Sequence, residues 1–289
     1  MGRGDTGPAG RRVLITGAAR GIGAALAERL HARGARVAVV GLEPDLLEAV
    51  AAKCGDAPCC GCDVTDREQV EAAVATAVDR LGGLDVVVAN AGVAAQLPIV
   101  GGNPAVMERT IAVNLMGVYN TLRAAGPHIS HDRGYAVVVS SAAAALHLPL
   151  LGAYCASKAA VEALGDSLRA ELRPSGARVG VAYFGELETD MTSRGFGTEA
   201  AAKLTRNTPL MKPAPLAVGI DALERGIARR ARRIVAPRWV GAILPIRMAV
   251  QPVIERAFSH RLEEALRVAR EEDAPLTTPQ PEPQPDSAP

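Results

Sequence analysis

Short runs of β-branched and other apolar residues alternate with alanine-rich stretches, and this alternation constrains the fold more than any other feature. We expect strands at Val13–Thr16, Val37–Val40, Asp85–Ala89, Ala136–Ser140 and Arg178–Tyr183, with weaker candidates at Cys59–Asp63 and Arg233–Ala236. Amphipathic stretches between strands are typical of βαβ units, in which neighbouring strands run parallel. The sequence therefore predicts one α/β domain with a Rossmann-type, doubly wound parallel sheet of about seven strands.

Size and charge limit the partners. A chain of 289 residues with 48% hydrophobic residues is sufficient for one large domain with a buried core. Its 32 basic and 31 acidic residues nearly cancel, so we expect no nucleic-acid partner and favour a small, neutral or lipophilic one. Residues 1–11 are polar and glycine-rich, predict a flexible segment and lack the apolar core of a secretory signal. We therefore expect a cytoplasmic protein.

Five cysteines are an odd number for a disulfide framework, which is also rare in the cytosol. Cys59, Cys60 and Cys62 are close enough together to raise the question of a metal site. Adjacent strand residues point to opposite faces, however, and no histidine or second cysteine pair lies nearby. We expect no metal, and we interpret these cysteines as buried strand residues.

The chain divides into a catalytic domain at 12–240 and two C-terminal segments. Glycines and prolines after Met191 exclude a long helix and predict a mobile flap over 191–215. Residues 241–272 form an apolar, helical extension, in which Pro245 and Pro252 argue against a membrane span over 242–258. Packing against another subunit or a membrane surface both remain open. The proline-rich residues 273–289 predict a disordered tail.

A glycine-rich turn follows the first expected strand. Gly17, Gly21 and Gly23 stand in a GxxxGxG pattern between that strand and a helix-forming stretch. Without side chains, the turn allows a pyrophosphate to approach the backbone, and the helix N-terminus offers N–H groups and the positive end of its dipole. The pattern favours a dinucleotide-binding turn over a plain strand-to-helix corner.

Tyr154 and Lys158 are separated by one helical turn, so they share a helix face. An ammonium group beside a phenol lowers the free energy needed to ionise it, so this tyrosine could transfer a proton near neutral pH. The spacing alone is a weak signal, because Tyr and Lys commonly occupy the solvated face of an ordinary helix.

Six motifs in one order resemble the short-chain dehydrogenase/reductase family over roughly residues 11–240: TGxxxGxG at 16–23, Asp63-Val64, Asn90-Ala91-Gly92, Asn114, Ser141 and YxxxK at 154–158. The resemblance implies that Tyr154 is the general acid/base and that Ser141, with Ser140 as the alternative, holds the same substrate oxygen. It also implies that Lys158 lowers the tyrosine's pKa and binds the nicotinamide ribose, and that Tyr154 is itself one of the cofactor contacts. Asn114 would hold a water that links Lys158 to solvent, unless it is a helix-interior residue satisfied locally.

The same resemblance implies the cofactor contacts. It assigns the glycine turn, with Gly17, Arg20, Gly21, Ile22 and Gly23, to the pyrophosphate. Asp63 and Val64 would bind adenine, while Asn90 and Gly92 would line the adenine ribose. Leu187 and Thr189 would hold the nicotinamide carboxamide, although Phe184 stands where the family commonly has proline, and Ala89 replaces the first asparagine of the usual Asn-Asn-Ala-Gly.

The choice between NAD and NADP stays open. In the family an acid at the place of Gly41 marks NAD, and an arginine at Leu42 marks NADP, but this chain has neither. Arg20 could pair with a 2′-phosphate, whereas Glu43 would repel one or bind a ribose hydroxyl.

The resulting hypothesis is an NAD(P)-dependent oxidoreductase that interconverts an alcohol and a ketone or aldehyde, on a lipophilic substrate. A catalytically silent NAD(P)-binding redox sensor is one alternative, and an epimerase or dehydratase is another. By resemblance we expect a homodimer or homotetramer. The arginines at 225–233, together with 242–258, leave open a peripheral membrane contact, against the simpler interpretation of a solvated helix face.

Overall fold

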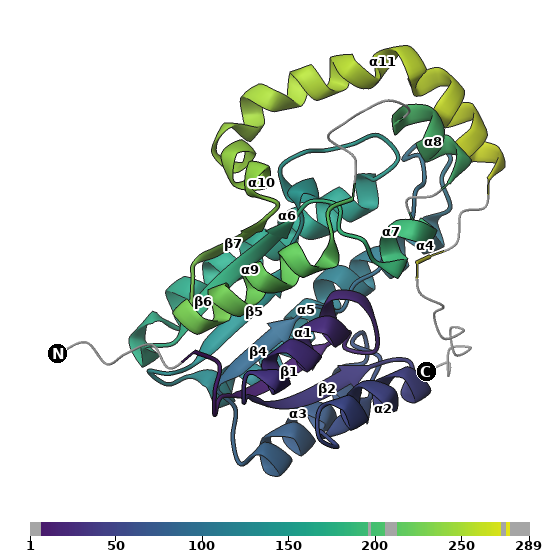
Figure 1. Ribbon diagram of the computed structural model, residues 1–289. Coiled ribbons are helices and arrows are strands. Elements are labelled where there is room, and N and C mark those ends of the chain that lie inside the picture. Colours follow the sequence, from purple (N-terminus) through teal and green to yellow (C-terminus); the bar gives the residue numbers. More distant parts are fainter. Residues whose placement is uncertain (1–6, 196–197, 206–212, 273–275, 278–289) are drawn as a thin grey trace, which may run out of the picture.

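A seven-stranded parallel sheet organises the chain in the order β3-β2-β1-β4-β5-β6-β7 (Figure 1). The computed structural model describes residues 7–195, 198–205, 213–272 and 276–277. The strands are β1 (Arg12–Thr16), β2 (Arg36–Gly41), β3 (Cys59–Gly61), β4 (Val86–Ala89), β5 (Tyr135–Val139), β6 (Arg178–Phe184) and β7 (Arg233–Ala236). The predicted sheet is thus confirmed, with strand ends shifted by one or two residues.

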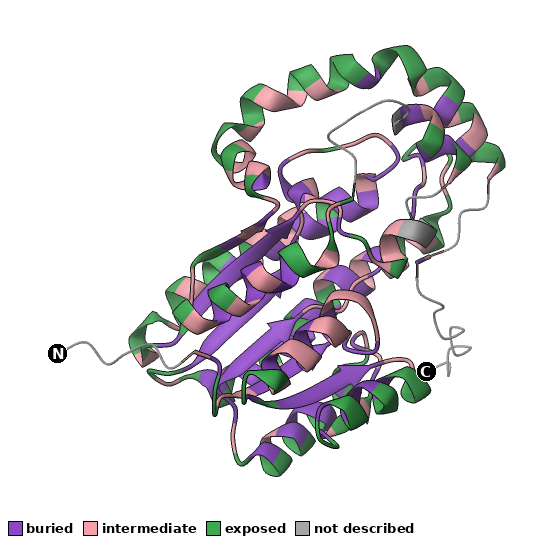
Figure 2. Cartoon of the chain, in the orientation of Figure 1, coloured by how far each residue is buried: buried purple, intermediate pink, exposed green. Residues whose placement is uncertain are grey.

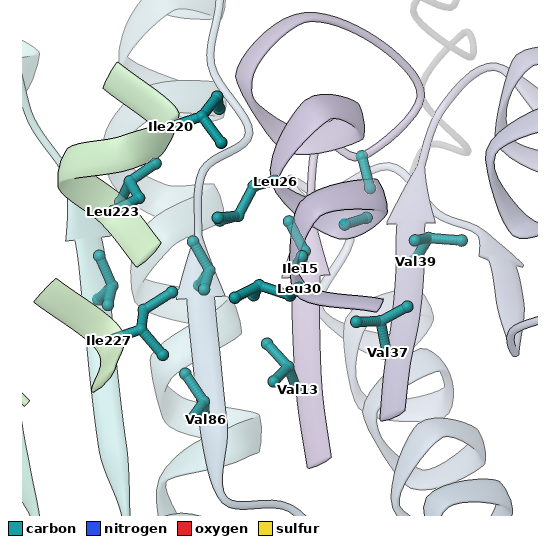
Figure 3. Packing of buried hydrophobic residues seen from close by; sticks show 14 of the residues in the cluster. Val13, Ile15, Leu26, Leu30, Val37, Val39, Val86, Ile220, Leu223 and Ile227 are labelled. Atoms are coloured by element: carbon teal, nitrogen blue, oxygen red, sulfur yellow. The ribbon is translucent and has the colours of Figure 1, made fainter. Parts of the chain in front are cut away.

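Helices cover both faces of this sheet. One face packs against α1 (Gly21–Ala32), α2 (Pro44–Lys53) and α9 (Leu216–Arg229), and the other against α3 (Arg67–Leu81), α5 (Gly117–Ile129) and α6 (Gly152–Glu171). Alternation along β1 explains the arrangement, because Val13 and Ile15 contact the first set while Leu14 contacts the second. Figure 3 shows Val13 and Ile15 among Leu26, Leu30 and Ile227. Because both faces are covered, the strands are largely buried (Figure 2).

The cysteines at 59, 60 and 62 were expected to be buried, but the structure buries only one of them fully. Cys59 is exposed and Cys60 is half-buried, whereas Cys62, just beyond the strand, is buried. The reason is topological, since β3 is an edge strand that pairs only with β2. Side chains on an edge strand have neighbouring strands on one side alone.

Shorter elements lie around the strands' carboxyl ends. They are α4 (Pro104–Ile111), the π-helix η1 (Ala112–Met116), η2 (Ala142–Ala144), α7 (Asp190–Gly195), α8 (Glu199–Thr205), α10 (Arg238–Ile243) and η5 (Leu244–Ile246), whereas η3 (Arg173–Ser175) precedes the amino end of β6. The region expected to be a flap therefore contains two short helices, α7 and α8. Residues 196–197 and 206–212 of that region lie outside the described residues.

The long helix α11 (Arg247–Glu271) packs against α8 (Figure 1). Leu204 of α8 and Phe258 of α11 share a buried apolar cluster with Leu150. Pro252 lies inside α11 and does not end it. Within the described ranges, no helix is both long and apolar enough to cross a bilayer.

Thr277, which falls in the expected disordered tail, is anchored, so the prediction is wrong at this position. Thr277 is buried, and its backbone N–H donates to the Ala94 carbonyl at 3.0 Å. The Ala94 N–H donates in turn to Thr277 Oγ1 at 3.0 Å. A polar threonine is buried here because reciprocal hydrogen bonds compensate for its lost hydration. The other tail residues, 273–275 and 278–289, lie outside the described part of the chain.

Candidate active site

The glycine-rich turn joins β1 to α1 and is held by Asn90 at the end of β4. The Asn90 side-chain amide donates to the carbonyl oxygens of Thr16 at 3.0 Å and Gly17 at 3.2 Å. A Cβ at position 23 would lie 2.2 Å from the Gly17 oxygen, so this position tolerates only glycine. At the N-terminus of α1, Arg20 makes no side-chain capping bond. The Arg20 side chain therefore does not cap the first N–H groups of α1, and these groups suit an anionic ligand.

A cavity of about 600 Å³ lies at the carboxyl ends of the strands. Of the residues predicted from sequence, it brings together Gly17, Arg20, Gly21, Ile22, Asp63, Val64, Asn90, Gly92, Ser141, Tyr154, Lys158, Leu187 and Thr189. Gly23 and Asn114 do not line it. Gly23 packs against Gly17 inside the glycine turn. Asn114 lies behind the cavity wall and accepts a hydrogen bond from Val93, so both residues support others of the site.

Tyr154 and Ser141 are linked at the wall of this cavity. Burial raises the pKa of Tyr154 to about 12, and its hydrogen bond with Ser141 acts in the opposite direction. Ser141 lies just past the end of β5, where its Oγ also accepts from the Ala143 N–H at 3.1 Å. Ser140 Oγ donates to the Lys158 carbonyl at 2.8 Å. The two serines therefore have different partners, and Ser141 is the one joined to the tyrosine.

Lys158 is buried next to Tyr154 on α6. Its Nζ donates to the Val139 carbonyl at 2.9 Å and lies 5.6 Å from the centre of the Tyr154 ring. Burial lowers the pKa of Lys158 to about 8. The lowered tyrosine pKa expected from the YxxxK spacing is not what this structure has, because burial of the phenol has the larger effect.

Asn114 is buried within the π-helix η1, and its hydrogen bonds are internal. Its Oδ1 accepts from the Val93 N–H at 2.7 Å, and its Nδ2 donates to the Val93 carbonyl at 2.9 Å and to Ser157 Oγ at 3.0 Å. Both amide protons are thus used, and one lone pair of Oδ1 remains for a further donor. A Cβ on Gly92 would lie 3.2 Å from Oδ1 and 3.4 Å from Lys158 Nζ. Gly92 therefore packs at the Tyr-Lys end of the cavity.

Asp63 follows β3 and is fixed by a residue that the sequence analysis did not identify. Arg109 of α4 donates to Asp63 Oδ2 at 2.7 Å, while Thr65 donates through its N–H and hydroxyl to Oδ1. Although burial acts to raise the pKa of Asp63, these bonds hold it below its ordinary value. Asp63 is consequently an oriented, ionised acceptor.

Three other cavity residues also carried no motif in the sequence. Glu186, just after β6, is half-buried, and burial raises the pKa of its carboxyl group. Trp239 and Phe258 bring aromatic surface from α10 and α11. Their helical periodicity marks Trp239 and Phe258 as core candidates only, since a cavity wall and a core have the same apolar pattern.

Comparison with known proteins places this geometry in a family. The family model for short chain dehydrogenases matches residues 11–200. A sorbitol dehydrogenase of Cereibacter sphaeroides is 38% identical over 173 residues, covering 59% of this chain and 68% of that protein. The chain belongs to the short-chain dehydrogenase family and is an oxidoreductase.

Two solved structures extend the comparison to the fold. A short chain dehydrogenase of Burkholderia cenocepacia in complex with NADP superimposes with a TM-score of 0.69 at 26% identity, covering 89% of this chain and 98% of that one. One from Burkholderia phymatum in complex with NAD has a TM-score of 0.72 at 22% identity, with coverages of 84% and 94%. The narrow glycine turn and the N-terminus of α1 at the cavity fit such a dinucleotide.

Proposed function

We propose that the protein catalyses NAD(P)-dependent interconversion of an alcohol and a ketone or aldehyde, with Tyr154 as the acid/base. The observation that carries the proposal is the hydrogen-bonded pair of Tyr154 and Ser141 in the same cavity as the glycine turn. The nicotinamide, when bound, would supply the hydride chemistry. The protein contributes position and proton transfer.

Each polar group has one task in this proposal. Ser141 donates a hydrogen bond to the substrate oxygen and orients it toward the Tyr154 hydroxyl, which gives or takes the proton. Lys158, with its ammonium held by the Val139 carbonyl, stabilises the tyrosinate that forms when the proton leaves. Gly17, Arg20, Gly21, Ile22, Asp63, Val64, Asn90, Leu187 and Thr189 would hold the cofactor, with Gly92 beside Lys158.

A lipophilic substrate is supported by the far end of the cavity. Beyond Tyr154 its lining includes the apolar side chains Leu146, Leu148, Leu204, Trp239, Ile254 and Phe258. Apolar walls of this kind bind hydrocarbon by removing its surface from water. Polar groups in the lining, namely Gln96, Glu186 and Arg261, offer hydrogen-bond partners for a polar substituent of such a substrate.

Oligomerisation and membrane contact are supported by exposed apolar side chains. Met107, Met116 and Tyr119 lie on the continuous α4, η1 and α5, with exposures of 40%, 45% and 45%, which suits a homodimer or homotetramer. Ile246 and Met248, exposed by 53% and 85%, stand in the chain between the cavity-lining Ile243 and Val250 and suit a peripheral membrane contact. Light scattering of the purified protein and sedimentation with anionic liposomes test the two separately.

A substrate screen tests the proposed activity. Medium-chain and long-chain secondary alcohols, sterols and retinoids are incubated with NAD and with NADP, and absorbance at the reduced cofactor's band is followed. We expect turnover of apolar alcohols by the unmodified protein and none by Tyr154→Phe. Cofactor binding without turnover of any alcohol or ketone would favour the silent redox sensor instead.

A further inference from the structure

Three charged residues from separate parts of the chain meet at one end of the cavity. Arg20 in the glycine turn donates through Nε to Glu43 Oε2 at 2.7 Å, and its Nη2 contacts Glu43 Oε1. Its Nη1 lies 3.2 Å from Asp190 Oδ2. Glu43 is the N-cap of α2 and Asp190 the first residue of α7. We call Arg20, Glu43 and Asp190 the charge triad.

We propose that the charge triad makes this protein selective for NAD over NADP, an inference that rests on the proposed function. Arg20 is the cation that a 2′-phosphate would need. Its guanidinium is already shared by two carboxylates, so the triad has a net charge of about −1 when all three groups are ionised.

The position of the triad relates it to the adenosine half of a dinucleotide. Arg20 belongs to the turn that would hold the pyrophosphate, and Glu43 lies two residues beyond the end of β2. Both line the cavity, as do Leu42 and Asp63 at the neighbouring strand ends. In folds of this type the adenine ribose lies beside the end of the second strand. Glu43 is therefore placed to accept a hydrogen bond from a ribose 2′-hydroxyl.

A 2′-phosphate would meet a different balance of charge. It carries close to two negative charges near neutral pH, and it would approach the Glu43 carboxylate. To bind it, Arg20 would have to give up a bidentate contact with Glu43, the strongest geometry available to a guanidinium. Among the described residues that line the cavity, the other cations are Lys158 and Arg261, on α6 and α11. Neither belongs to the adenosine end.

The triad also connects this end to α7. Asp190 is 53% exposed in its side chain, against 24% for Glu43, so its contact with Arg20 is the weaker of the two. Removing Asp190's charge should therefore change nucleotide choice less than removing that of Glu43.

Binding can be measured without knowing the substrate. Trp239 is the single tryptophan of the chain and lines the cavity, so excitation of Trp239 should transfer energy to a bound reduced nicotinamide. NADH and NADPH are titrated separately into the full-length protein. We expect NADH to bind about tenfold or more tightly than NADPH.

Variants assign the preference to the triad. Glu43→Gln should tighten NADPH binding about tenfold and weaken NADH binding by a few fold, because Arg20 becomes available to the phosphate. Asp190→Asn should shift both constants in the same directions by a smaller factor. Glu224→Gln is the matched control, since Glu224 also pairs with arginines, Arg29 and Arg33, but does not line the cavity. Circular dichroism verifies that each variant is folded.

The outcomes separate this inference from the proposed function. Equal binding of NADH and NADPH by the unmodified protein would overturn NAD selectivity while leaving the proposed activity intact. A preference for NADH that survives in both folded variants would overturn the role of the triad. Binding of neither nucleotide would overturn the proposed function and the selectivity together.

Discussion

Replacing Lys158 with methionine should stabilise the folded protein near neutral pH, although it removes a residue of the proposed proton relay. Lys158 is 4% exposed, and burial lowers its pKa from 10.5 to about 8. Methionine has a similar length and needs no hydration. The prediction is thus that this lysine reduces stability in exchange for function.

The magnitude follows from proton linkage. Because the folded pKa lies below the unfolded one, the folded state binds fewer protons between pH 8 and 10.5, and stability rises with pH in that window. Below pH 8 the destabilisation is fully present and amounts to about 3 kcal/mol. At pH 10 it falls below about 1 kcal/mol. The lost hydrogen bond to the Val139 carbonyl offsets about 1 kcal/mol of the gain.

Urea denaturation of Lys158→Met and the unmodified protein at pH 7 and pH 10, with reductant, measures the difference. We expect the variant to be more stable by about 2 kcal/mol at pH 7 and to lose that advantage at pH 10. Lys53→Met is the control, because Lys53 is 64% exposed in its side chain and should change stability by less than about 0.5 kcal/mol. A variant that is less stable at pH 7, or whose advantage persists at pH 10, would refute the reasoning.

Two further predictions concern the turn and the tail. Gly23→Ala should weaken NADH binding at least about tenfold, because the added Cβ would collide with the Gly17 oxygen. The tryptophan energy-transfer assay measures this, and an unchanged affinity would contradict the claim that the turn is rigid. Truncation after residue 275 should lower the free energy of unfolding by about 2 kcal/mol through loss of the Thr277 bonds to Ala94. Truncation after Thr277 keeps those bonds and serves as the control in the same urea experiment. An equal loss of unfolding free energy in the two truncated proteins would contradict the claim that Thr277 anchors the tail.

The sheet and the cavity could be predicted from sequence because their signals are local. The three consecutive apolar residues Val13, Leu14 and Ile15 indicate a strand that is buried on both faces. The spacing of the glycines that follow indicates the turn after this strand. Parallel strands end at one edge of a sheet, so Asn90 after β4 and Ser141 after β5 belong at the same opening. The structure brings both to that opening.

Other features depend on contacts that no local pattern contains. Arg109 meets Asp63 across 46 residues, and an arginine on a helix carries no mark of its partner. Thr277 lies in a proline-rich segment whose composition predicts disorder, yet one backbone pairing with Ala94 buries it. The i,i+4 spacing to Lys158 indicates a lowered pKa for Tyr154, whereas burial of the phenol, which depends on the whole fold, has the larger effect and raises it.

The central claim is that Tyr154 transfers the proton in a site whose cofactor contacts are otherwise independent of its hydroxyl. The most direct measurement compares Tyr154→Phe with the unmodified protein, using the best alcohol from the screen and NADH binding by energy transfer from Trp239. We predict a fall in kcat of at least about a hundredfold with a Kd for NADH that changes less than about threefold. Turnover at the unmodified rate with intact cofactor binding would contradict the account.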